Sequence, residues 1–126
     1  MGVTAAGKAA MADLFGDVNS IAAFTYLELG SSDTAFADTQ TALVSAITGS
    51  GLARAAATVT RTTTTDTNDT TQLSKTWTAS GSQTVREIGV FNASSSGTMA
   101  ARSVLSTARS LTSGNTYTGT YKVVFA

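Results

Sequence analysis

The feature that most constrains the fold is an alternation of apolar and polar residues in short segments bounded by turn-forming residues. Residues 22–29, AAFTYLEL, place Leu27 and Leu29 on one side of an extended chain and aromatic residues on the other. A period of two is that of a β-strand, whose successive side chains point to opposite faces. The segment therefore predicts a strand that ends at Gly30.

Five further segments are predicted strands, and several are rich in threonine, whose β-branched side chain suits a pleated surface. DTND (66–69) and NASSSG (92–97) supply turn residues for two hairpins. Trp77, the only tryptophan, is expected in the core. Short strands with regularly spaced turn signals predict a mainly β fold, an antiparallel β-sandwich or barrel. The five segments are 53–65, 70–80, 84–91, 98–105 and 115–125.

A short N-terminal helix is predicted over residues 4–18, with Thr4 as its cap. Apolar side chains recur there at intervals of three and four and form one stripe. The stripe suits either packing on the protein's own sheet, which we expect, or docking on a partner. A second, brief helix is predicted over 39–48, closed by Gly49. The stripe consists of Met11, Leu14, Phe15 and Val18.

The 126 residues are expected to form a single domain, 1–126, that folds without a disulfide or a cofactor. Cysteine and histidine are absent, which removes thiolate nucleophiles, the commonest general base and the usual zinc ligands. Asp66, Asn68 and Asp69 resemble the start of a calcium loop, but the glycine and the distant glutamate of such loops are missing. We therefore expect no catalytic residue, no metal and no cofactor.

Charge is segregated along a chain whose formal net charge is zero. Residues 1–53 carry Lys8 against five carboxylates, and residues 54–126 carry seven cations against three carboxylates. Such a split suits contact with oppositely charged surfaces, including other copies of the chain, although chance remains an alternative. No basic cluster interleaved with aromatic residues indicates direct nucleic-acid binding. No signal-peptide core and no apolar run of about 20 residues is found, so we expect a protein made in the cytoplasm without a membrane partner.

Glu87 is a lone carboxylate in the predicted strand 84–91. A hairpin folded symmetrically about NASSSG places Glu87 directly opposite Arg102, and this predicts a structural ion pair. Gly89, on the same face, leaves room for a bulky neighbour. The alternative is a glycan hydrolase, which needs a second acid about 5 to 9 Å away, and Glu28 is the only other glutamate. The structural interpretation needs no further residue and is preferred.

Four segments, in order along nearly the whole chain, resemble small structural proteins of tailed bacteriophages. The pattern Glu-x-Gly-hydrophobic-Phe, a small polar loop, and Gly-Thr-Met-x-Ala-Arg recur in that family. Many relatives have leucine at Ala100, and their glycine–aspartate before the last strand is Gly114-Asn115 here. The segments are FTYLELG (24–30), GLARAAATVTR (51–61), REIGVFNASSSGTMAAR (86–102) and YKVVF (121–125).

The resemblance implies a non-enzymatic virion protein. Relatives include capsid decoration, head fibre, tail fibre and collar proteins. We expect a capsid decoration protein on the capsid exterior, a homotrimer that binds the major capsid protein, and the alternative is a tail, collar or fibre component. Phe36, in a polar loop, either anchors a partner or tucks under the protein's own core. The loop 92–97 is expected to face solvent or a neighbour. The candidate partner contacts are Phe15, Phe36, Asp33 and Asp38.

Overall fold

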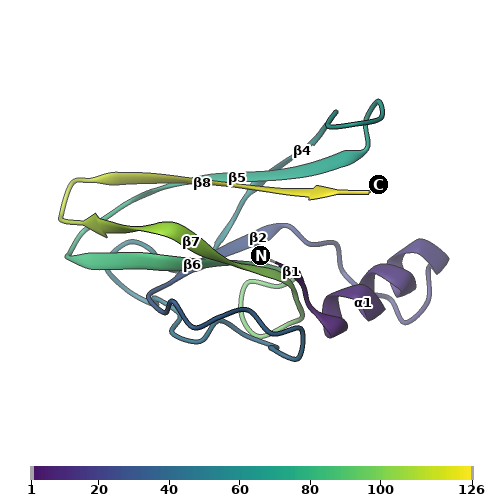
Figure 1. The fold of residues 1–126 in the computed structure, drawn as a ribbon, viewed down its shortest axis with the longest axis horizontal. Helices are drawn as coiled ribbons and strands as arrows, with labels where there is room; N and C mark the ends of the chain where they lie inside the picture. Colours follow the sequence, from purple (N-terminus) through teal and green to yellow (C-terminus); the bar gives the residue numbers. More distant parts are fainter. Residues whose placement is uncertain (1, 126) are drawn as a thin grey trace.

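Two antiparallel sheets pack face to face in the computed structural model, which describes residues 2–125 (Figure 1). The elements are β1 (Gly2–Val3), α1 (Ala5–Gly16), β2 (Tyr26–Gly30), β3 (Ala55–Ala56), β4 (Thr58–Thr62), β5 (Thr70–Thr78), β6 (Gln83–Phe91), β7 (Met99–Leu111) and β8 (Thr116–Val124). The five-stranded sheet has the order β1-β7-β6-β2-β3, and the three-stranded sheet has the order β4-β5-β8. The predicted mainly β fold with a short N-terminal helix is confirmed, in its sandwich form.

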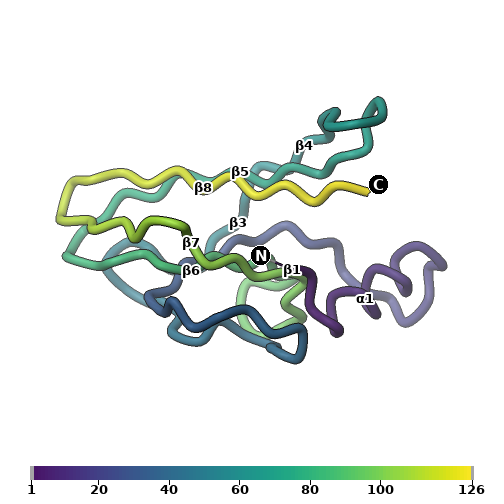
Figure 2. Tube along the Cα trace, viewed as in Figure 1, coloured from purple at the N-terminus to yellow at the C-terminus, as the bar shows by residue number. Residues whose placement is uncertain are grey.

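The chain crosses from one sheet to the other at three places, which Figure 2 traces. The crossings are at Ala57 between β3 and β4, at 79–82 between β5 and β6, and at 112–115 between β7 and β8. Residues 53–65 therefore do not form one strand as predicted, because β3 pairs with β2 while β4 pairs with β5. The hairpin that joins β4 to β5 through residues 66–69 is confirmed.

The main core lies between the sheets and is built from the inward-facing apolar positions of both. Trp77 is buried there, as predicted, and its indole N–H donates to the carbonyl oxygen of Ala53 at 2.9 Å. That bond satisfies the polar end of a large apolar side chain. The buried residues around it include Leu27, Leu29, Leu73, Val85, Ile88, Val90, Ala101 and Tyr121.

The five-stranded sheet is also covered on its outer face, by the segment of residues 31–54. Leu43 from this segment packs against Phe91 of β6 and Met99 of β7 in a second apolar cluster. The backbone N–H of Ile47 bonds to the carbonyl of Leu29 at 2.9 Å. The central strand β6 is consequently buried at almost every position in its second half, instead of alternating.

The predicted helix at 39–48 is wrong. The segment runs without helix, and Ala46 forms an isolated antiparallel bridge with Gly30. The N–H groups of Val44 and Ser45 bond to the side chain of Glu87, so they cannot close a helical turn. Two boundaries also differ: the strand predicted from residue 22 begins at Tyr26, and the strand predicted to end at 105 runs on to Leu111.

Helix α1 begins after the predicted cap, Thr4, whose hydroxyl accepts from the N–H of Gly7 at 2.9 Å. It packs on β7 through its first turns, where Gly7 lies against the backbone of Ala100. The rest of the helix extends past the end of the five-stranded sheet, on the same side as the β4–β5 turn and the C-terminus (Figure 1). The predicted apolar stripe is therefore buried only in part: Met11 packs on the core, while Leu14, Val18 and above all Phe15, 96% exposed, do not.

Candidate functional site

Glu87 and Arg102 form a fully buried ion pair on the outer face of the five-stranded sheet. The Nε of Arg102 donates to the Oε1 of Glu87 at 2.8 Å, and both side chains are 0% exposed. The predicted register is wrong, because Glu87 lies opposite Val104 and Arg102 lies opposite Gly89. The register already differs by one residue at Phe91, which lies opposite Met99, and a β-bulge between Phe91 and Val90 shifts it by one more. The pair therefore forms diagonally instead of directly across.

The carboxylate of Glu87 also binds the segment that covers it. Its Oε1 accepts the N–H of Val44 at 3.0 Å, and its Oε2 accepts those of Ser45 at 2.9 Å and Ser32 at 3.1 Å. Gly30, opposite on β2, makes space for this, since a Cβ there would lie 2.5 Å from the Cγ and Oε2 of Glu87. Glu87 thus joins the sheet to the loop above it.

The protonation of Glu87 follows from these contacts. Burial by itself would raise the pKa of the Glu87 carboxyl, but the hydrogen bonds from Arg102 and from three backbone N–H groups outweigh burial. The pKa therefore lies below its usual value of 4.5. A carboxylate that is held ionised and has no exposed surface is unsuited to general acid catalysis, which requires a proton to donate to an accessible substrate.

Arg102 extends the same network. Its Nη1 donates to the carbonyl oxygen of Thr34 at 2.9 Å and to the side-chain oxygen of Gln40 at 3.4 Å. Both Glu87 and Arg102 therefore bond to the segment 32–45 and hold it against the sheet. Such bonds from a guanidinium and a carboxylate are stronger than neutral ones.

The candidate partner contacts in that covering segment are differently placed. Phe36 is half-buried, and its ring lies where a side chain on Gly2 of β1 would be, so it packs within the molecule. Asp33 and Asp38 are exposed. The structure does not bring these three residues together with Phe15, which lies on the projecting part of α1.

A second pair, Arg54 with Glu28, was missed by the sequence reasoning. The Nε and Nη2 of Arg54 each donate to one carboxylate oxygen of Glu28 at 3.2 Å, and the guanidinium lies 3.7 Å above the centre of the Phe91 ring. Its Nη1 donates to the carbonyls of Ala93 at 3.1 Å and Ser96 at 2.7 Å. The sequence offered one signal for this pair: Arg54 and Glu28 are each the single charged residue in an otherwise uncharged segment.

This second pair fixes the loop of residues 92–97. Asn92 adds a bond from within the loop, since its Oδ1 accepts the N–H of Thr98 at 2.8 Å. The side chains of Ser94, Ser95 and Ser96 remain exposed. The loop does face solvent, but its backbone is held in place.

The two glutamates do not form the acid pair of a glycan hydrolase. Glu28 lies opposite Gly89 and Glu87 lies opposite Gly30, so they are diagonal neighbours on adjacent strands. Each carboxylate is bonded by its own arginine, and Glu87 has no exposed surface for a substrate or water. Both are used to hold loops.

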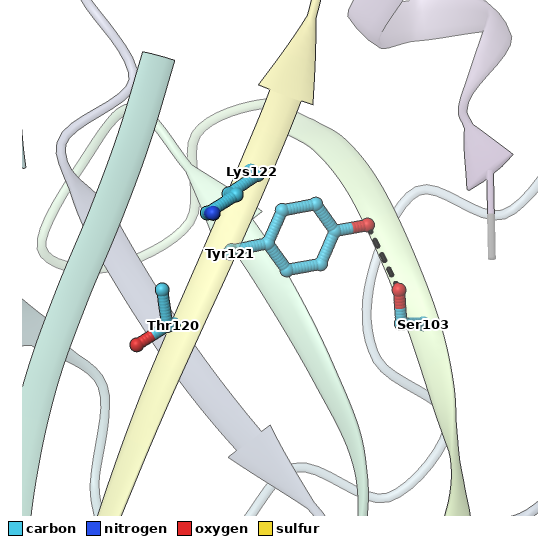
Figure 3. Close-up of a pocket in the computed structure, with 4 residues that line it drawn as sticks. All are labelled: Ser103, Thr120, Tyr121 and Lys122. Carbon is cyan, nitrogen blue, oxygen red and sulfur yellow. Dashed lines mark hydrogen bonds between the residues drawn. The ribbon is translucent and has the colours of Figure 1, made fainter. Parts of the chain in front are cut away.

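A hydrogen bond between two side-chain hydroxyls also has a structural role. Ser103 of β7 donates to the phenol oxygen of Tyr121 on β8 at 3.0 Å, which joins the two sheets (Figure 3). Burial raises the pKa of Tyr121, so the phenol stays protonated near neutral pH and does not act as a base. Thr120 and Lys122, which alternate with Tyr121 along β8, direct their side chains away from that bond (Figure 3).

The calcium-like residues serve the β4–β5 turn. The carboxylate of Asp69 accepts the N–H groups of Thr64 and Thr65 at 2.9 Å and of Asp66 at 2.8 Å. Hydrogen bonds from the backbone N–H groups, that of Asp66 first, lower the pKa of Asp69. Within residues 2–125, no group of three or more acidic, histidine or cysteine side chains is placed to hold a metal ion, and no helix is long and apolar enough to cross a membrane.

Comparison with known proteins gives one family and no curated relative. No curated protein matches the chain. The family described as Podophage GP4 fiber I protein gp80 matches residues 3–122, which include α1, both sheets and the two arginine–glutamate pairs. This match confirms the resemblance to structural proteins of tailed phages. The chain belongs to the podophage GP4 fiber I protein gp80 family and is a structural protein of a phage virion.

Proposed function

We propose that the chain is a subunit of a virion fibre. The observation that carries the proposal is the family match, because the matching family is described as a fibre protein and the match covers residues 3–122. The match reaches from β1 into β8, so the whole sandwich corresponds to the family, and not an isolated motif. A fibre subunit is therefore preferred over a capsid decoration protein.

The chemistry of the described residues supports a binding role without enzymatic activity. The two arginine–glutamate pairs hold the loops 32–45 and 92–97 against the five-stranded sheet. Fixing these two loops gives the outer face a defined shape, which suits a surface that contacts other proteins. A role in attachment or assembly follows from such a surface.

A capsid decoration protein is the second candidate. The described residues form a short sandwich with one helix of 12 residues, a shape that suits a cap on a shell as well as the base of a fibre. In this role the protein would bind the major capsid protein on the capsid exterior as a homotrimer. The exposed Asp33 and Asp38 would then be candidate contacts.

The two candidates differ in copy number. Purified virions should be digested and the chain quantified against the major capsid protein by mass spectrometry with isotope-labelled peptides. A fibre subunit is expected at a small fraction of the capsid protein's abundance. Abundance comparable to that of the capsid protein would instead support decoration, and absence from purified virions would contradict both.

A further inference from the structure

An apolar groove lies at the end of the sandwich, where α1 diverges from the three-stranded sheet. Its volume is about 230 Å³, and its floor reaches core residues such as Leu73 and Val90. Leu73 and Val90 are each only 1% exposed, so the groove is a hollow over the closed end of the core. The walls are formed by Met11 and Leu14 of α1, Phe24, Val59 of β4, and Val123 and Phe125 at the end of the chain.

The rims of this groove are unusually apolar for a protein surface. Three of the residues that line it are exposed: Leu14 of α1, Val59 of β4, and Phe125, which is 59% exposed. Exposed apolar residues scattered singly are normal, but a group around one hollow marks an interaction site. The groove therefore suits an apolar occupant.

Phe15 is the occupant that the chain itself can supply. It is 96% exposed, more than any other large apolar side chain among the described residues. Successive residues on a helix point about 100° apart, so Leu14 can line the groove while Phe15 points elsewhere. Phe15 is therefore available for contact with another copy of the chain.

Charge favours the same contact. Asp13 lies in the second half of α1, Asp17 is the C-terminal cap of the helix, and the last turn has no basic residue. Carboxylates at a helix C-terminus are opposed by the helix dipole, so a cation supplied by a partner stabilises them. Arg61 is exposed on β4, two residues after Val59 and on the same side of the strand, and it forms no ion pair with any described residue.

We propose that the projecting end of α1 docks into the apolar groove of a second copy of this chain. Phe15 enters the groove, and Asp17 lies beside Arg61 of that copy. Each copy carries both a helix and a groove, so each can donate and accept. This contact concerns assembly between copies and goes beyond the fibre or decoration role, since either would use it.

The test is the oligomeric state of the full chain by sedimentation velocity, with circular dichroism as the check on folding. Wild-type protein is expected to self-associate, and Phe15→Asp is expected to weaken the association by at least roughly tenfold, because burying a phenylalanine is worth about 1.5 to 3 kcal/mol. Ala108→Asp is the control, an exposed apolar residue on β7 that does not line the groove, and it should leave association unchanged.

A charge exchange gives a second, independent readout. Asp17→Arg and Arg61→Asp should each weaken association, and the double variant should regain it. A monomeric wild-type chain that binds only another virion protein would overturn the proposal. So would a Phe15→Asp variant that associates as tightly as the wild type, or a double charge variant no tighter than the single ones.

Discussion

Arg102 and Glu87 form a salt bridge at 2.8 Å with no exposed surface, although neither stands directly opposite the other in the sheet. The pair makes six hydrogen bonds in all, one within the pair and five to the covering loop. The register of β6 and β7 brings the two side chains into diagonal reach. Removing one partner leaves the other buried and uncompensated, so breaking such a pair is strongly destabilising.

Arg102→Ala should lower the free energy of unfolding by about 3 to 5 kcal/mol, since it leaves Glu87 charged in a buried site. Urea denaturation followed by circular dichroism measures the loss. Arg109→Ala is the matched control, because Arg109 is an exposed arginine on the same strand, and it should change stability by no more than about 0.5 kcal/mol. Equal effects of the two substitutions would contradict a buried role for Arg102.

Stability should fall in acid through Glu87. Its folded pKa lies below the usual 4.5, so the unfolded chain binds more protons than the folded one below about pH 4.5. The stabilisation is therefore present above that pH and is lost as pH falls toward the folded pKa. Glu87→Gln should flatten this slope, which denaturation series at several pH values would measure. An unchanged slope would show that Glu87 does not carry the acid sensitivity.

Gly7→Ala should destabilise the protein, although alanine is the better helix former by about 1 kcal/mol. The added Cβ would collide with the backbone of Ala100 where α1 packs on β7. Gly16→Ala, in the same helix, meets only a methyl group of Val18 at 3.9 Å, and should be neutral or slightly stabilising. Thermal melting compares the two. If both variants melt above the wild type, α1 does not pack closely on β7.

Arg54→Lys should loosen the loop 92–97 while it keeps the positive charge. Lysine cannot bond both oxygens of Glu28 and two loop carbonyls at once, because it lacks the planar fork of arginine. Hydrogen exchange should become faster at Ala93 to Thr98, with a loss of about 1 to 2 kcal/mol in stability. Arg61→Lys, at an exposed site, should leave exchange in the loop unchanged.

The strands were predictable from the sequence because they repeat with a period of two and are bounded by turn residues. Leu27 and Leu29 alternate as a sheet requires, and both are buried. Residues 39–48 misled the prediction because their apolar content fits a helix, whereas their backbone bonds to Glu87 and Leu29 from distant strands. Tertiary contacts of this kind leave no local signal.

The ion pair was predictable in its partners but not in its geometry. A symmetric hairpin placed Glu87 directly opposite Arg102, and neither the one-residue offset at Phe91 nor the β-bulge after it has a marker in the local sequence. The apolar stripe on α1 was recognised, but a period shows which side chains share a face and not whether anything covers them. Phe15, near the end of α1, is 96% exposed, and only the fold reveals this.

The fibre role is the central claim, and cryo-electron microscopy of intact virions tests it most directly. A difference map between wild-type particles and particles that lack this chain locates it. We predict difference density of the size of this sandwich in appendages that project from the particle. Difference density confined to the shell, lying over contacts between capsid subunits, would contradict the fibre role.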